Sequence, residues 1–304
     1  MMNSLSDNTI SQYNCSLRLW WEFCQLRDIS PFKYDVPNII SFLQQVMNTS
    51  NNTYSSFNSH RAALSLITSS DLGTNTEVKR FMKGIFRTRP PRPRYNFTWN
   101  LQDVLKFLNK PPDKDLRSVS CKLVALLVLA TGQRIQTVAL IRCPNIKFST
   151  SGADIQIPDF VKTSGPKTLQ PKLSLPYFHE CPNLCVASCL HQYLELTKPL
   201  RPADCDKLFL TFNKPHGPAT KQTLSRWVKN TMAKTGIDTN MFKPHSSRHA
   251  STSCALRQGV HIDAIRRSAG WSQDFQTFAR FYNRPLVEKD NYLTSVLNLL
   301  SSET

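Results

Sequence analysis

The chain contains no apolar run long enough to cross a bilayer. Its longest strongly apolar stretch covers only residues 123–130, whereas a membrane-spanning helix needs about 20 residues. Acidic residues are also few, since 21 Asp and Glu face 38 Lys and Arg, for a formal net charge of +17. We therefore expect no membrane partner and favour a polyanionic one, nucleic acid first. A merely basic soluble protein is the alternative that charge alone leaves open.

Cysteines form no disulfide framework. Their number is nine, which is odd, and they are scattered along a chain without a recognisable signal peptide. We therefore expect reduced thiols in an intracellular protein. Cys181, Cys185, Cys189 and His191 stand close together, but their spacing fits no common zinc site, so we expect no metal. The sequence also has no internal repeat and no low-complexity tract.

Hydrophobic periodicity predicts a first domain of four helices over residues 1–86. Its first helix carries an apolar stripe, and we assign Trp20, Trp21 and Phe23 to the core. Ser6 is one candidate for the residue that caps this helix. The expected helices cover residues 4–29, 36–47, 54–70 and 77–88.

The second predicted domain, residues 98–304, is mostly helical with one small sheet. Gly132 ends a buried helix, and residues 153–160 and 172–178 have the pattern of two strands of a hairpin. The predicted fold class is thus mainly α with a small antiparallel β-sheet, in two domains. The expected helices cover residues 98–108, 118–132, 185–197, 220–236, 245–259, 261–270 and 286–302.

A basic, proline-rich segment at residues 87–97 joins the two predicted domains. Its prolines end the preceding helix and stiffen an extended path. The segment is either a solvated linker or a strap that neutralises several DNA phosphates at once, and we favour the strap. Its arginines are Arg87, Arg89, Arg92 and Arg94.

Four residues of the second domain have the chemistry of phosphodiester cleavage. Arg134 follows a helix-ending glycine, and Arg248 stands three residues after His245, on the same face of a helix. Arginine stabilises the charge that grows on the non-bridging oxygens. His245 can donate to the phosphate or accept a proton, and Tyr282 is a nucleophile that can hold the cut strand. Taken singly, each has a structural alternative, such as a surface ion pair or aromatic packing.

The order of ATGQR, HSSRH, AGW and FY along the chain resembles the active site of the tyrosine recombinases, the family of Cre and phage lambda integrase. The closer likeness is to the recombinases of DIRS-like, Ngaro-like and Crypton transposable elements. The resemblance implies that Arg134, His245 and Arg248 hold the phosphate. It also implies that Trp271 supports them through its indole and that Tyr282 is the nucleophile.

The resemblance also implies a lysine from a β-hairpin as general acid. The VKTSGPKT segment offers Lys162 or Lys167, and we prefer Lys162, which we place at a strand end. The sequence departs from the family pattern in three places. Ser247 replaces a usual leucine, Thr137 stands where many members have an acid, and the spacing of eleven positions from Trp271 to Tyr282 is a little longer than in Cre-like enzymes. Tyr292 is a fallback nucleophile.

For the whole chain, the resemblance implies a helical, SAM-like core-binding domain at residues 1–86 and a catalytic domain at residues 98–304, which close as a clamp on duplex DNA. The expected function is site-specific recombination that integrates or excises a mobile element through a 3′-phosphotyrosine, without a metal or other cofactor. The expected partners are double-stranded DNA and copies of the same chain, as a tetramer on DNA and a monomer free in solution. The C-terminal helix would dock into a neighbouring protomer, and in a eukaryotic host the location would be nuclear.

Two other functions stay open. One is a domesticated DNA-binding protein that no longer cuts, against which the intact residue set argues. The other is a relaxing enzyme similar to type IB topoisomerases, against which the lack of a long linker argues. Beyond the linker arginines, we expect DNA contacts from basic residues on predicted helices, namely Arg61, Arg80, Lys83, Lys221, Arg226 and Lys229.

Overall fold

The structure is a computed structural model that describes all residues except 1–4, 92–93, 112–114, 166–169, 272–283 and 287–304. The chain divides into two compact units, Met1–Pro93 and Arg94–Thr304. The described residues are mainly helical with one three-stranded antiparallel sheet, which confirms the predicted fold class. None of the described helices is both long and apolar enough to cross a membrane. The expected C-terminal helix lies almost entirely outside the described residues.

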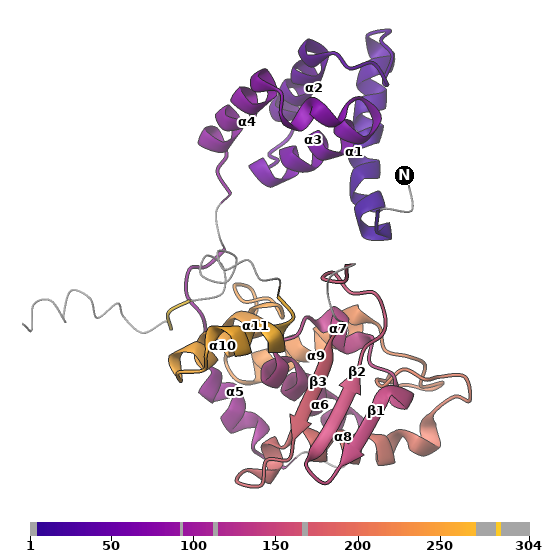
Figure 1. The fold of residues 1–304 in the computed structure, drawn as a ribbon, viewed down its shortest axis with the longest axis vertical. Helices are drawn as coiled ribbons and strands as arrows, with labels where there is room; N and C mark the ends of the chain where they lie inside the picture. Colours follow the sequence, from indigo (N-terminus) through magenta and orange to yellow (C-terminus); the bar gives the residue numbers. More distant parts are fainter. Residues whose placement is uncertain (1–4, 92–93, 112–114, 166–169, 272–283, 287–304) are drawn as a thin grey trace, which may run out of the picture. The chain divides into compact units, whose positions relative to one another are not determined.

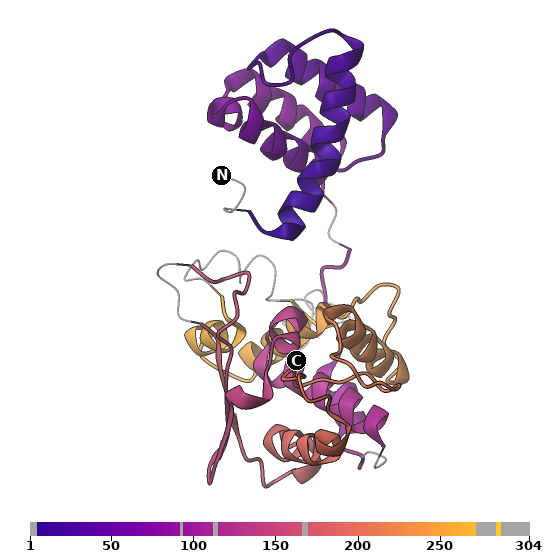
Figure 2. The same cartoon turned by 90° about the vertical axis from the view of Figure 1, so that its right-hand side faces the viewer.

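The first unit is a bundle of helices, which Figures 1 and 2 show from two sides. Ser6 caps the first helix, because its hydroxyl oxygen accepts from the backbone N–H of Thr9 at 3.2 Å. Pro37 stands in the first turn of the second helix, where its missing N–H costs nothing. The α-helices of this unit are α1 (Asp7–Leu26), α2 (Val36–Thr49), α3 (Tyr54–Ile67) and α4 (Thr76–Thr88).

An aromatic cluster joins α1 to α2. The rings of Trp20 and Phe23 stack with centroids 5.6 Å apart, and Phe42 meets Trp20 edge-on at 5.3 Å. Such pairs stabilise a core beyond their buried area. The core assignment is confirmed for Trp20 and Phe23 but is wrong for Trp21, which is 50% exposed. The buried face of α1 runs through Ser16, Trp20, Phe23 and Cys24, and Trp21, about 100° around the helix from Trp20, lies beyond its edge.

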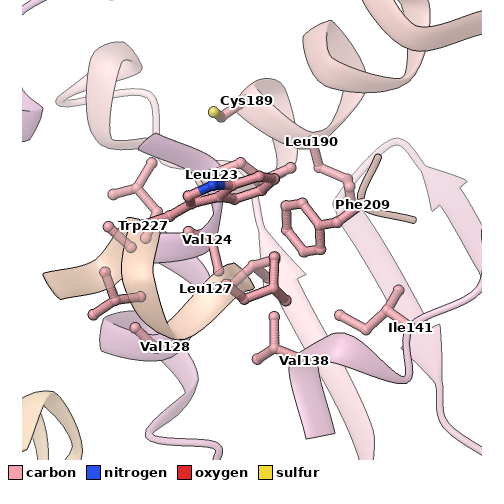
Figure 3. Packing of buried hydrophobic residues seen from close by; sticks show 14 of the residues in the cluster. Leu123, Val124, Leu127, Val128, Val138, Ile141, Cys189, Leu190, Phe209 and Trp227 are labelled. Atoms are coloured by element: carbon pink, nitrogen blue, oxygen red, sulfur yellow. The ribbon is translucent and has the colours of Figure 1, made fainter. Parts of the chain in front are cut away.

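Helix α6 is the central helix of the second unit. It packs against α8 and α9, and Leu123, Val124 and Leu127 lie in a cluster with Phe209 and Trp227 (Figure 3). An all-round apolar helix is buried in this way. The α-helices of the unit are α5 (Leu101–Leu108), α6 (Leu116–Thr131), α7 (Ile135–Ala139), α8 (Val186–Thr197), α9 (Lys221–Lys234), α10 (Ser246–Arg257) and α11 (Ile262–Ala269).

The sheet has the order β1–β2–β3 and is antiparallel throughout. Ile155 in the middle strand pairs with Ile146 on one side and Leu173 on the other. The last two strands in sequence, β2 and β3, form the predicted hairpin, whereas β1 was not predicted. None of its residues is fully buried, so β1 lacks the alternation of buried apolar and exposed polar residues that predicts a strand. The strands are β1 (Ile146–Ser149), β2 (Gly152–Gln156) and β3 (Lys172–Pro176).

Candidate active site

A left-handed glycine fixes the turn that carries Arg134. Gly132 ends α6 at φ 61° and ψ 12°, a conformation that glycine adopts without steric cost. Arg134 is the N-cap of the next helix, α7, and is half-buried. Arg134 thus stands on a short turn that is anchored to the buried helix α6.

Helix α10 brings Arg248 to the same turn. His245 is the N-cap of α10, and Arg248 lies in its first turn with only 1% of its surface exposed. Nη1 of Arg248 donates to the carbonyl oxygen of Gly132 at 2.9 Å, across 116 positions of sequence. A guanidinium is always charged and costly to bury. A buried arginine beside a second one is therefore a strong candidate for holding an anion.

His245 lies among three cations. Burial, which removes water from the imidazole, lowers its pKa, and nearby positive charges lower it further, to about 4. These charges belong to Arg248, Arg134 and Lys162. Part of the side-chain surface stays exposed, and burial and the three cations lower the pKa together. The imidazole is neutral at neutral pH, and four of the predicted site residues share one electrostatic environment.

Trp271 follows a second left-handed glycine. Gly270 ends α11 at φ 62°, and the backbone N–H of Trp271 donates to the carbonyl oxygen of Arg266 at 3.0 Å. Cζ of Arg248 lies 4.5 Å from the centre of the Trp271 ring, within the range of cation–π attraction. The indole therefore packs on the buried guanidinium, as a supporting residue would.

Two side chains that the sequence analysis missed tie these turns together. Nε2 of Gln133 donates to the carbonyl oxygen of Ser268 at 2.6 Å, and Oγ of Ser268 donates to the carbonyl oxygen of Thr131 at 3.0 Å. Gln133 is 4% exposed, and its hydrogen bond to Ser268 is partly buried. The first bond spans 135 positions, and no local sequence pattern predicts such a contact.

Lys162 lies in a turn of the connection between β2 and β3, and it is exposed. The backbone N–H of Ser164 donates to the carbonyl oxygen of Val161 at 2.8 Å, and Oγ of Ser164 accepts from the N–H of Val161 at 2.9 Å. The predicted place of Lys162 at a strand end is wrong, because β2 already ends at Gln156. The alternative general acid, Lys167, lies outside the described residues.

The two candidate nucleophiles, Tyr282 and Tyr292, lie outside the described residues. Arg284, however, is held on α10. Its backbone N–H donates to Oγ of Ser253 at 3.1 Å, and its carbonyl oxygen accepts from Nη1 of Arg257 at 3.0 Å. The chain two positions after Tyr282 is thus fixed to the helix of the predicted phosphate-binding residues.

Most of the expected DNA contacts lie on exposed faces of the two units. On α4 they stand at helical spacing on the face opposite the buried apolar residues. The exposed residues are Arg80, Lys83 and Arg87 on α4, Arg94 at the start of the second unit, and Lys221 and Arg226 on α9, while Lys229 is half-buried and Arg92 lies outside the described residues.

Arg89 and Arg61 form hydrogen bonds inside the first unit instead. Nη1 of Arg89 donates to the carbonyl oxygen of Ser50 and Nη2 to that of Met47, both at 2.7 Å. These oxygens lie at the end of α2, where carbonyl groups lack helical partners. Nη1 of Arg61 donates to the carbonyl oxygen of Gly73 at 3.2 Å. Both arginines therefore have a structural role that the sequence analysis did not predict.

The cysteines near α8 form no metal site in the described part of the chain, where no three His, Cys, Asp or Glu side chains are placed to hold an ion. Cys185 instead caps α8. Burial raises the pKa of its thiol, but hydrogen bonds from Ser188 and the backbone N–H of Phe178 bring it below its ordinary value.

A family profile matches the sequence, and solved structures match the fold. The sequence profile of the Phage integrase family matches residues 99–288. The XerH site-specific recombinase, crystallised with its difH substrate in a pre-cleavage complex, is 16% identical at a TM-score of 0.60, over 94% of this chain and 78% of that chain. A lambda integrase dimer bound to a COC′ core site is 14% identical at a TM-score of 0.57, over 94% and 91%.

The Tn1549 transposon integrase in complex with transposon right-end DNA is 15% identical at a TM-score of 0.56, over 87% of this chain and 85% of that chain. At these identities the likeness shows the fold. No curated protein sequence matches the chain.

Proposed function

The chain belongs to the phage integrase family, enzymes of the tyrosine recombinase type that break and rejoin DNA, and on this premise we propose that it acts through a 3′-phosphotyrosine intermediate. One observation carries the proposal: the buried guanidinium of Arg248 donates to the turn that carries Arg134 and packs against the indole of Trp271. These residues come from three separate segments of the second unit. A protein that only binds DNA has no need to gather them around one buried guanidinium, whereas phosphoryl transfer needs fixed positive charge at one phosphate.

In the proposed reaction, the phenol oxygen of Tyr282 attacks the DNA phosphorus. A bond forms between that oxygen and phosphorus while the bond from phosphorus to the 5′ oxygen breaks, which leaves the 3′ phosphate on the tyrosine. The 5′ oxygen takes its proton from Lys162, and the phenol proton passes to the neutral imidazole of His245. Rejoining reverses these steps, so the phosphodiester energy is kept and no nucleotide or metal is needed.

Arg134 and Arg248 would stabilise the charge on the two non-bridging oxygens. Their rate effect depends on being in place before the reaction starts. The hydrogen bond from Arg248 to Gly132 and the packing of Trp271 on its guanidinium support such preorganisation. Two residues of chain span at most about 7 Å, so the anchoring of Arg284 on α10 also supports Tyr282 as the nucleophile.

The proposed substrate is double-stranded DNA, and the proposed role is the integration or excision of a mobile element, in the manner of a DIRS-like, Ngaro-like or Crypton recombinase. Residues 1–86 would bind DNA and residues 98–304 would also cut it. The exposed basic faces of α4 and α9 support this division. Exchange of strands between two duplexes requires four active sites, so we propose a monomer in solution and a tetramer on DNA. Residues 286–302 would then link neighbouring protomers.

A library of nicked suicide duplexes with random sequence tests the proposal. Wild-type protein is expected to form covalent adducts, and sequencing of the trapped DNA gives the preferred site. Duplexes built on that site should then be joined to one another, and Tyr177→Phe should leave the adduct yield unchanged. No adduct with any duplex would favour a non-cutting DNA-binding protein. Adducts with supercoil relaxation but no joining of two duplexes would favour a topoisomerase-like enzyme.

A further inference from the structure

A salt-bridge network holds the segment that leads to Lys162. Arg142, which precedes β1, donates from Nε and Nη2 to the two carboxylate oxygens of Asp159, at 3.1 and 2.7 Å. Its remaining nitrogen, Nη1, donates to Oδ2 of Asp206 at 2.7 Å. Nζ of Lys207 lies 3.8 Å from Oδ1 of Asp159. The network therefore joins three segments that are distant in sequence.

The geometry of the Arg142–Asp159 pair makes it a strong ion pair. Two parallel hydrogen bonds from a guanidinium to a carboxylate fix orientation as well as distance. The side chain of Asp159 is 18% exposed and that of Arg142 35% exposed, so solvent and salt screen the pair less than an exposed one. The hydrogen bonds from Arg142 hold the pKa of Asp159 below its usual range. The carboxylate is therefore ionised at neutral pH.

Arg142 is itself held by backbone contacts with the segment at Asp206 and Lys207. Its backbone forms an antiparallel bridge with Lys207, and the neighbouring N–H of Cys143 donates to the carbonyl oxygen of Asp206 at 2.8 Å. On the other side of the pair, Val161 is 4% exposed and lies in the core. Lys162 thus follows two anchors, the carboxylate at position 159 and the buried valine at 161.

We propose that the Arg142–Asp159 pair positions the general acid of the reaction. It fixes residues 159–162 so that Nζ of Lys162 reaches the leaving 5′ oxygen. The proposal rests on the proposed function of Lys162. Arg142 and Asp159 act through that lysine and are therefore positioning residues.

The test compares two DNA substrates, both with the site recovered from the suicide-duplex library. One has the natural 5′ oxygen, and the other has a 5′-bridging sulfur, a leaving group that needs no proton. Asp159→Asn is expected to slow cleavage of the natural substrate about 10- to 100-fold, the scale of a small misplacement of a catalytic group. The same variant is expected to cleave the sulfur substrate at nearly the wild-type rate.

Lys162→Ala is the reference for loss of the acid, and it should show the same rescue by sulfur with a larger defect, about 100-fold or more. Asp154→Asn is the matched control, because Asp154 pairs with Lys172 at 3.0 Å on the same sheet and should leave both rates unchanged. Arg142→Lys keeps the charge but loses the two-pronged bond. It should give a milder defect that sulfur also rescues.

The outcomes separate the role of Lys162 as general acid from the positioning role of the Arg142–Asp159 pair. Failure of sulfur to rescue Lys162→Ala would remove Lys162 as the acid, and the positioning proposal with it. Rescue of Lys162→Ala without rescue of a slowed Asp159→Asn would leave the acid in place and overturn the positioning role. Wild-type rates for Asp159→Asn on the natural substrate would overturn it as well. If Asp159→Asn does not fold, Arg142→Lys decides by the same criteria.

Discussion

The carbonyl oxygen of Gly132 accepts a hydrogen bond from Nη1 of Arg248 at 2.9 Å, so the glycine that ends α6 also orients a buried arginine of α10. The glycine is needed for the turn, because a side chain at φ 61° is strained. The carbonyl it presents is needed for the arginine. Chain reversal and the orientation of the buried Arg248 therefore depend on the same residue.

Gly132→Ala is expected to destabilise the protein by about 1–3 kcal/mol and to lower the yield of covalent DNA adduct. The new Cβ would lie 3.3 Å from a methyl group of Thr252, which adds crowding to the backbone strain. Urea unfolding measures the first effect and the suicide-duplex assay the second. Gly236→Ala is the control, since Gly236 has φ +80° with nothing within 4 Å. Equal stability of the two variants, with full adduct yield for Gly132→Ala, would contradict the account.

The pKa of His245 is expected to rise when one neighbouring cation is removed. Without DNA, its imidazole should titrate near pH 4, and Lys162→Met should move the pKa upward toward the ordinary value of 6.5. NMR titration of the imidazole resonances measures both values. Lys172→Met removes the same charge on β3, where it does not affect this imidazole, and should change nothing. An unchanged pKa in Lys162→Met would mean that Lys162 is not near His245 in solution.

The same pKa also gives a stability prediction with a definite sign. Because the folded-state pKa of His245 is lowered, the unfolded chain binds the proton more readily. The free energy of unfolding should therefore fall as the pH drops from about 6.5 to about 4. In His245→Asn this part of the pH dependence should disappear. An identical pH profile of urea unfolding in the two proteins would argue against the shift.

Gln133 and Ser268 are expected to act as a coupled pair. Gln133→Leu leaves the carbonyl of Ser268 without its donor and should destabilise the protein by about 1–3 kcal/mol. Ser268→Ala removes the second bond between the same two turns and should cost less, because Ser268 is exposed whereas Gln133 is buried. In a double-mutant cycle the two losses should not add, with a coupling of about 0.5 kcal/mol or more. Additive losses would show that the two bonds do not stabilise one shared arrangement.

Substitution of Arg89 is expected to affect stability, and substitution of Arg87 is expected to affect DNA binding. Arg89→Ala should lower the free energy of unfolding by about 1–3 kcal/mol, because the guanidinium bonds carbonyl oxygens at the end of α2. Arg87→Ala, on the exposed face of α4, should change stability by less than about 0.5 kcal/mol. It should instead weaken DNA binding and reduce the slope of affinity against salt by about 1. The reverse pattern would refute these roles.

Much of the fold could be predicted because its signals are local. Ser6 caps α1, Gly132 ends α6, and the apolar sequence of α6 buries it, as its pattern indicates. Strand β1 could not be predicted, because its exposed residues lack the alternation that marks a half-buried strand. Trp21 was misassigned because an apolar residue on a helix can still face solvent.

In the candidate site, too, the residues that could be predicted are those with a local sequence signal. The motifs around Arg134, His245 and Arg248 could be recognised because each is a short string. The structure brings their segments together, since Arg248 bonds Gly132 in the turn before Arg134 and His245 begins the helix that carries Arg248. Gln133 and Asp159 could not be found, because their partners lie far away in sequence and become neighbours only in the folded protein. The sequence pattern therefore predicts the residues that would contact DNA but not the residues that would hold them in place.

Identification of the tyrosine that carries DNA tests the central claim most directly. Adducts from the suicide duplex would be digested with protease and nuclease, and the peptide that retains a nucleotide would be sequenced by mass spectrometry. The account predicts a 3′-phosphodiester on Tyr282 and loss of the adduct, with DNA binding retained, in Tyr282→Phe. A nucleotide on Tyr292, or an undiminished adduct in Tyr282→Phe, would contradict it.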